Sequence, residues 1–203
     1  AQRGLNLIKE KQASALEKLS SGERINKAGD DAAGLAISEK LKAEIRGNRQ
    51  ATRNASDGVS FIQTAEGGLN EIASILIRLR ELSVQAASDT VGDTERGFIN
   101  KEVQQLISEV DRIAEGTRFG KVQLLNGTGE MFSFQVDIGN DDFVDRIEFD
   151  SSQQIATTSE LGVDSFDFSD KADAQEALDM LEDAQRQVNG YRANLGAIQN
   201  RLL

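Results

Sequence analysis

Residues 37–86 decide the fold, and they read ISEKLKAEIRGNRQATRNASDGVSFIQTAEGGLNEIASILIRLRELSVQA. Apolar residues recur here mostly in steps of three and four, at Ile37, Leu41, Ile45, Ala55, Val59, Ile62, Ala65, Leu69, Ile72, Leu76, Leu79, Leu82 and Ala86. This period near 3.5 is typical of a helix packed along a supercoiled seam. Asp30 and Asp31 are suited to cap its first turn. The pattern stops near residue 88, which predicts one helix of roughly 80 Å.

Four glycines interrupt this helix, at positions 47, 58, 67 and 68. Each weakens a helix by about 1 kcal/mol relative to alanine. We therefore expect them to permit the close approach of a neighbouring helix, or a bend.

Three further helices follow from the same periodicity. The second spans about 93–115, on Ile99, Val103, Leu106, Val110 and Ile113, and the third runs from Asp170 to the end of the chain. The first 18 residues predict a short amphipathic helix. Isolated helices are marginal in water. We therefore expect the helix at 170–203 to lie along the long helix, and the helix at about 93–115 to pack against both.

Residues 131–138 alternate strictly, with Phe132, Phe134, Val136 and Ile138 on one side. Residues 139–142 form a turn, and Phe143, Ile147 and Phe149 fit a return strand. Since a lone hairpin is marginal, its phenylalanine face should dock on the helices. Residues 151–169 read as polar and irregular.

These elements predict a mainly α fold, an elongated antiparallel bundle of long heptad helices with a small β-hairpin region. We expect two parts: residues 1–29, the end of an amino-terminal helix and a turn region, and residues 30–203, a helical core domain. Within the core, residues 130–169 form an acidic hairpin and loop segment.

The composition argues against an enzyme. The chain has no His and no Cys, so the commonest general base, the thiol nucleophile and the usual zinc ligands are missing. Asp137, Asp141, Asp142 and Asp145 invite a calcium interpretation, but they lack the spacing of a calcium loop, which favours a charged turn. We assign no catalytic, cofactor-binding or metal-binding residue.

The net charge of −11 is unevenly placed. Residues 130–183 hold 16 acidic and two basic residues, a net of −14, whereas the remainder holds 18 acidic and 21 basic residues, a net of +3. Such an acidic chain is a poor partner for nucleic acid. No apolar run reaches the roughly 18 residues of a membrane span, so no membrane partner is expected. The acidic segment is interpreted as solvated outer surface.

Four stretches, in order, resemble bacterial flagellins. They are residues 19–47, LSSGERINKAGDDAAGLAISEKLKAEIRG, residues 53–60, RNASDGVS, residues 79–86, LRELSVQA, and residues 195–202, LGAIQNRL. The resemblance implies a structural subunit that self-assembles into the helical tube of the motility filament. It also implies export to an extracellular flagellum, with other protomers, an export chaperone, and cap and junction proteins as partners.

Set against the family, the chain resembles a minimal flagellin with little outer domain. It also resembles one shortened at both ends, since flagellins begin about a dozen residues earlier and continue past Leu203 with a second apolar helix.

Some flagellins are detected by a host Toll-like receptor through their helical core. The positions that match this motif are Arg78, Glu81, Leu82, Gln85 and Glu109. Receptor-activating members usually carry Gln where this chain has Ile77. The alternative is ordinary solvated charge, with Leu82 in the core.

Two other functions stay open from the sequence. A hook-filament junction protein shares the terminal-helix pattern, and a secreted coiled-coil binding or effector module could display the acidic tip to a partner. Ser151, Ser152, Thr157, Thr158 and Ser159 could carry sugars, although a plain polar loop is the simpler interpretation.

Overall fold

The structure is a computed structural model and describes residues 2–203. Its helices are α1 (Gln2–Ser21), α2 (Ala32–Ala86), α3 (Asp93–Gly116), the short 3-10 helix η1 (Ser151–Gln153) and α4 (Lys171–Leu202). Its strands are β1 (Arg118–Phe119), β2 (Val122–Gln123), β3 (Met131–Gln135) and β4 (Arg146–Asp150). The chain divides into two compact units, residues 1–50 and residues 51–203, which we call the amino-terminal unit and the core unit.

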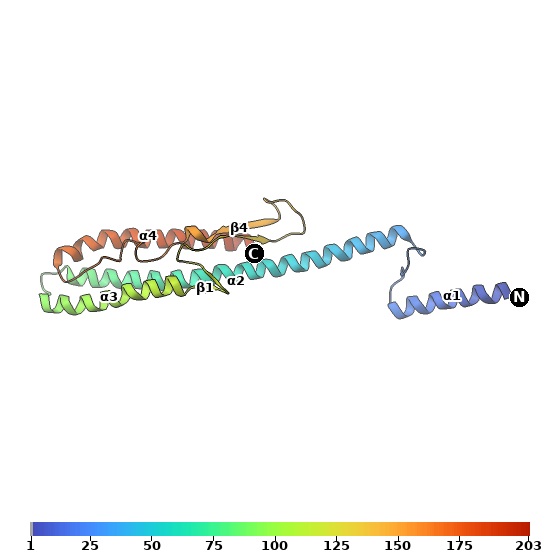
Figure 1. The fold of residues 1–203 in the computed structure, drawn as a ribbon, viewed down its shortest axis with the longest axis horizontal. Coiled ribbons are helices and arrows are strands. Elements are labelled where there is room, and N and C mark those ends of the chain that lie inside the picture. The colour runs from blue at the N-terminus through green and yellow to red at the C-terminus, as the bar shows by residue number, and fades with distance from the viewer. Residues whose placement is uncertain (1) are drawn as a thin grey trace. The chain divides into compact units, whose positions relative to one another are not determined.

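In the core unit, α3 and α4 run beside α2 (Figure 1). Apolar side chains of all three helices are buried in one hydrophobic core, among them Leu69, Ile72, Leu76, Leu79, Val103, Val110, Leu181, Val188 and Leu195. The predicted bounds of α3 and α4 agree with the structure within one residue. The mainly α fold with a small hairpin is confirmed.

Polar contacts fix how the three helices meet. The Ser83 hydroxyl donates to the Ala174 carbonyl at 2.7 Å, which joins α2 to α4. The buried Arg96 donates to the carbonyls of Ala86 and Ser88 at 2.9 and 3.1 Å. Because those carbonyls lie at the end of α2, Arg96 of α3 caps that helix and sets the turn between the two.

The hairpin docks on α2 through its phenylalanine face, as predicted. β3 and β4 are antiparallel, with Phe132 opposite Phe149 and Phe134 opposite Ile147. The Phe61 ring lies 4.7–5.8 Å from four other phenylalanine rings, those of Phe119, Phe132, Phe134 and Phe149. Asn54 Nδ2 adds a hydrogen bond to the Gln135 carbonyl at 3.0 Å.

The predicted strands were too long. β3 ends at Gln135 and β4 begins at Arg146, so Ile138 and Phe143 lie in the connecting turn and are exposed. Asp141 accounts for the early end, because its carboxylate accepts the N–H groups of Phe143 and Val144 and closes a turn there.

Residues 154–168 are irregular, as predicted, but they are not simply solvated. Apolar side chains of this segment are buried in the core, namely Ala156, Leu161, Val163, Phe166 and Phe168. Asp111 of α3 accepts hydrogen bonds from the backbone N–H and hydroxyl of Thr158, at 2.9 and 2.8 Å. The segment is therefore a strap, with its apolar side chains inside and its acidic side chains outside.

The amino-terminal unit contains α1, a turn region and the first part of α2. Asp31 caps α2, as predicted, by accepting the N–H of Gly34 at 2.9 Å. Asp30 instead accepts the N–H groups of Asn26 and Lys27 within the turn. Along the chain, the boundary between the two structural units falls after Gln50. A domain boundary at residue 29, drawn from the turn region, stays a proposal.

The heptad seam does not stay buried along all of α2. The side chains of Ile37, Leu41 and Ile45 are 61, 51 and 51% exposed, whereas the pattern predicted them inside. The physical reason is that α4 runs along α2 only from Ser83, which bonds to Ala174, to Gly58, which lies beside Leu202. Buried apolar residues of α2 begin only at Ala51.

Candidate functional site

Three of the four predicted receptor residues of α2, namely Arg78, Glu81 and Gln85, lie on one exposed face of that helix, because these positions are spaced by three and four residues. The Arg78 guanidinium lies 2.9 Å from Glu81 Oε2 and donates to Glu102 Oε1 of α3 at 2.9 Å. Its hydrogen bonds to Glu81 and then to Glu102 raise the pKa of Arg78 above its ordinary value. The face is therefore a charged surface that joins two helices.

Glu102 was missed by the sequence analysis. No motif marks it, because its role depends on how α3 is aligned against α2. Aligning the heptads of the two antiparallel helices, which places residue 78 opposite residue 102, is the one sequence signal that could have predicted this pair.

Glu109 lies about two turns further along α3, outside the Arg78 cluster. It pairs with Arg112, whose Nε donates to Glu109 Oε2 at 2.6 Å. This hydrogen bond lowers the pKa of Glu109 below its ordinary value. Leu82 is only 2% exposed and belongs to the hydrophobic core. The structure thus gathers Arg78 and Glu81, leaves Glu109 apart, and removes Leu82 from the surface.

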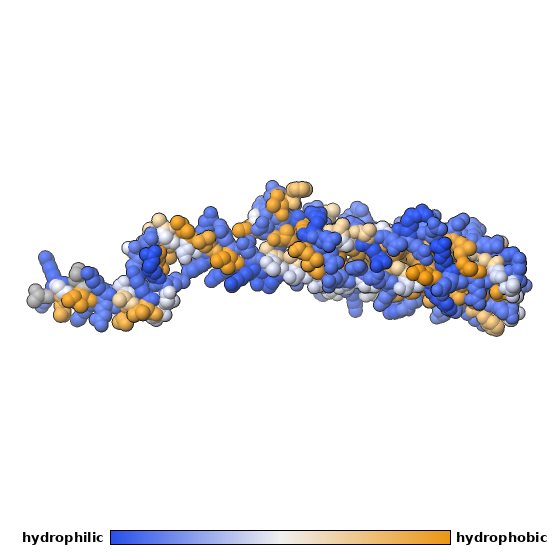
Figure 2. Space-filling model, turned by 180° about the vertical axis from the view of Figure 1, so that it is seen from behind, coloured by the Kyte–Doolittle hydropathy of each residue, from blue (hydrophilic) through white to orange (hydrophobic). Residues whose placement is uncertain are grey.

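A second surface lies on the amino-terminal unit. Large apolar side chains are exposed along α1 and the start of α2, at Leu5, Ile8, Leu16, Leu19, Ile37, Leu41 and Ile45. Figure 2 shows apolar side chains uncovered over these segments. Since they follow helical spacing, they form apolar faces suited to packing against other helices.

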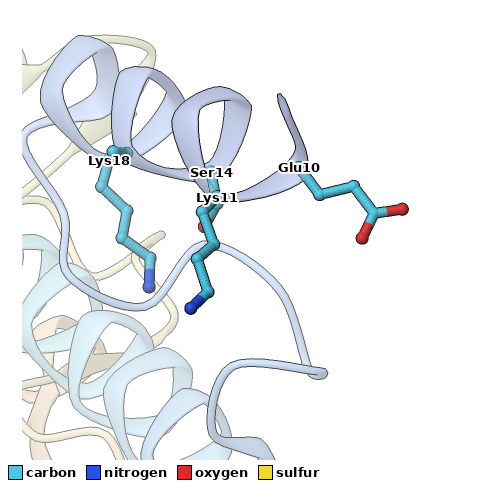
Figure 3. Close-up of a pocket in the computed structure, with 5 residues that line it drawn as sticks. Glu10, Lys11, Ser14 and Lys18 are labelled. Atoms are coloured by element: carbon cyan, nitrogen blue, oxygen red, sulfur yellow. The ribbon is translucent and has the colours of Figure 1, made fainter. Parts of the chain in front are cut away.

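A shallow hollow on α1 is lined by Glu10, Lys11, Ser14, Ala15 and Lys18. Figure 3 shows Lys11 and Lys18 extending to the same side of the helix, whereas Glu10 points away. Lys18 also lies 3.4 Å from Asp30. The hollow combines small side chains with two cations.

The acidic clusters are explained by local structure. Asp141 and Asp145 accept backbone N–H groups in the hairpin turn, and Asp170 caps α4 through the N–H of Ala172. Among residues 2–203, no three His, Cys, Asp or Glu side chains gather in a way that could hold a metal ion. Over the same residues, no helix combines the length and apolarity that crossing a membrane would need.

The chain has long helices with one continuous core, exposed apolar faces, and carboxylates that serve turns and caps. Together these features define a structural protein built for helix packing. Comparison with known proteins agrees. A family model described as the bacterial flagellin N-terminal helical region matches residues 1–130. A flagellin of Halalkalibacterium halodurans is 43% identical over 202 residues, covering all of this chain and 73% of that protein.

Two further comparisons point the same way. A flagellar filament 31.3 kDa core protein of Treponema maltophilum is 42% identical over 202 residues, which cover 94% of this chain and 71% of that protein. The crystal structure of Bacillus cereus flagellin superposes with a TM-score of 0.65 at 31% identity, covering 74% of this chain and 85% of that one. The chain belongs to the bacterial flagellin family. It is a structural subunit of the flagellar filament, which copies of it build by self-assembly.

Proposed function

We propose that the two units have separate tasks in the filament. The core unit is a preformed rigid body, because it buries its apolar side chains within itself. The amino-terminal unit supplies the packing faces, because its large apolar side chains are exposed. The single observation that carries this proposal is the exposure of Ile37, Leu41 and Ile45, which continue the buried seam of α2. On assembly, helices of the filament cover them.

When two different faces of a subunit bind each other from copy to copy, and the rotation between copies does not close a ring, the copies form an open helical filament. The buried area then drives assembly, at roughly 1.5–3 kcal/mol for each fully covered Leu or Ile.

The test is a matched pair of charged substitutions in the full-length protein. Leu41→Asp places a carboxylate on the apolar face, and Ala43→Asp places one on the exposed opposite side of the same helix. We expect Leu41→Asp to abolish filament formation, measured by electron microscopy and sedimentation, and Ala43→Asp to leave it intact. Equal assembly of both variants would refute the proposal.

The remaining roles are proposed on weaker support. We infer that the chain has no catalytic activity, since it lacks His and Cys and its carboxylates serve turns and caps. We infer that it acts outside the cell in the flagellum, after meeting an export chaperone, and that cap and junction proteins contact it in the filament. A hook-filament junction role is the alternative. Abundance separates the two, because a filament subunit dominates the protein of sheared flagella.

Recognition by a host Toll-like receptor is a second proposed function. The observation that favours it is the exposed, ordered face of Arg78, Glu81 and Gln85, braced by Glu102. Arg78→Ala is expected to lower activation in a receptor reporter assay by tenfold or more. Arg80→Ala is the control, because Arg80 contacts Gln185 and Glu182 of α4 instead. An equal response to both variants would argue against this face.

A further inference from the structure

The turn between β3 and β4 exposes three large apolar side chains. Phe143 is 88% exposed, and Val144 and Ile138 are also more than half exposed. The turn extends from the bundle beyond the ends of the two strands (Figure 1). Because soluble proteins rarely place several large apolar side chains on one projecting turn without a partner, this turn is a candidate contact surface.

The turn is held in one conformation. The carboxylate of Asp141 accepts two backbone N–H groups, and that of Asp145 accepts the N–H of Asp141 at 2.7 Å. A Cβ at Gly139 would collide with the Asp145 carboxylate, so that glycine permits the close approach. Arg146 donates to Gln135 Oε1 at 3.0 Å and also pairs with Asp142. An ordered turn loses little entropy when it docks, so Phe143 is suited to be an anchor.

The charge of the turn selects its partner. Residues 137–145 contain four Asp and no Lys or Arg. In another copy of the chain, the core unit carries 13 basic and 27 acidic residues, a net of −14, and would repel this turn. The amino-terminal unit carries ten basic and seven acidic residues, a net of +3. Electrostatic complementarity therefore directs the turn to residues 1–50 of a neighbouring copy.

Within residues 1–50, the hollow on α1 matches the turn. Ser14 and Ala15 are small enough to admit a ring, and Glu10, Lys11 and Lys18 complete the lining. Lys11 and Lys18 extend to the same side of the helix, whereas Glu10 points away from them (Figure 3). Asp141 and Asp142 directly precede Phe143, and a ring beside two carboxylates suits a small-residue floor beside two ammonium groups. Cations also interact favourably with the face of a ring.

We propose that Phe143 and Val144 of one subunit dock on the α1 hollow of a neighbouring subunit in the filament, with Asp141 and Asp142 facing Lys11 and Lys18. The proposal rests on the proposed function, because it names the partner segment of one packing contact. The two surfaces differ, so the contact is heterologous and can repeat along a filament without closing.

Cross-linking tests the contact directly, since the chain has no cysteine. Two populations of the full-length protein, Val144→Cys and Ser14→Cys, are mixed, assembled and oxidised. We expect disulfide-linked dimers in filaments and none in unassembled protein. The control mixture pairs Val144→Cys with Gln105→Cys, an exposed position on α3. Filaments without Ser14-linked dimers, or with equal dimers in the control, would overturn the contact and leave the filament function intact.

A second measurement uses Phe143→Ser. Because Phe143 is almost fully exposed, the melting temperature of the monomer should not change. The critical concentration for assembly should rise about tenfold, the effect of losing one buried ring. Phe98→Ser removes another exposed phenylalanine and should leave the critical concentration unchanged. An unaltered critical concentration for Phe143→Ser would overturn the contact, whereas failure of the unsubstituted protein to assemble would overturn the proposed function as well.

Discussion

Two adjacent glycines of α2 occupy opposite environments. Gly68 is buried, and a Cβ there would collide with the Thr117 hydroxyl and lie 2.8 Å from Leu125 Cδ1. Gly67 is exposed, and nothing would lie within 4 Å of its Cβ. The close approach that the sequence predicted for these glycines therefore holds at Gly68, and its neighbour is the turn after α3 rather than another helix.

Alanine at each position should change stability in opposite directions. Gly68→Ala should lower the free energy of unfolding by about 1–3 kcal/mol, because the overpacking outweighs the gain in helix propensity. Gly67→Ala should raise it by up to about 1 kcal/mol, because only the propensity changes. Urea unfolding followed by far-UV circular dichroism measures both. If both substitutions stabilise the protein, the Thr117 side chain must move away from the added methyl group at Gly68 without a loss of stability.

Asp89 makes stability depend on pH. Its carboxylate accepts a hydrogen bond from Lys171 Nζ at 2.6 Å, which ties the turn after α2 to the start of α4. This bond lowers the pKa of Asp89 below its ordinary value. A depressed folded pKa stabilises the protein above the ordinary pKa of about 3.9, and this contribution disappears as the pH falls through the lowered value.

Asp89→Asn should therefore weaken the folded state at neutral pH and have no effect in strong acid. Urea unfolding at several pH values checks whether the difference from the unsubstituted protein begins to decline near pH 4 and vanishes only in stronger acid, below the lowered pKa of Asp89. Asp57→Asn, at an exposed carboxylate of α2, is the control. A difference that stays constant down to pH 2 would contradict the role of the Asp89 charge.

At the scale of elements, the strap of residues 154–168 depends on α3. Asp111→Ala would leave the buried N–H and hydroxyl of Thr158 without their acceptor, at a cost of about 1–3 kcal/mol. Hydrogen exchange should accelerate in residues 156–163 more than in α2. Glu115→Ala, one turn further along α3 and exposed, should leave the exchange of the strap unchanged. Equal exchange in both variants would mean that apolar packing alone holds the strap.

The helices could be predicted because their signal is local. The 3.5 period placed α2, α3 and α4, and strict alternation placed the hairpin. The strap was harder, because Leu161, Val163, Phe166 and Phe168 alternate irregularly with acidic residues and match neither period. Its burial depends on α3 and α4 offering a groove, which no local pattern encodes.

The candidate site was predictable to a lesser degree. The heptad pattern itself placed Leu82 on the seam, which conflicts with its place in the receptor motif, and the structure agrees with the heptad. The pairing of Arg78 with Glu102 spans 24 positions and needs the alignment of two helices. Spacing within one helix could therefore identify Arg78, Glu81 and Gln85 as a face, but not what braces that face.

At the scale of the whole molecule, the residues of the folded core differ from the residues that we propose to drive assembly. Every fully buried apolar side chain of the described residues lies at or after Ala51, whereas long stretches before it expose leucine and isoleucine. The stability of the core unit therefore has its own source, whereas on the proposed function the amino-terminal unit gains its burial in the filament.

Removal of residues 1–50 should separate these two properties. We expect residues 51–203 alone to unfold cooperatively with a melting temperature within a few degrees of that of the whole chain, because the deletion removes no core side chain. Assembly should be lost entirely, because the apolar faces of α1 and early α2 are gone. Calorimetry and sedimentation measure the two outcomes. As a control for sensitivity, Leu76→Ala in the same fragment should cost about 2–5 kcal/mol. A shortened chain that still forms filaments, or that melts without cooperativity, would mean that the two units share one folding core.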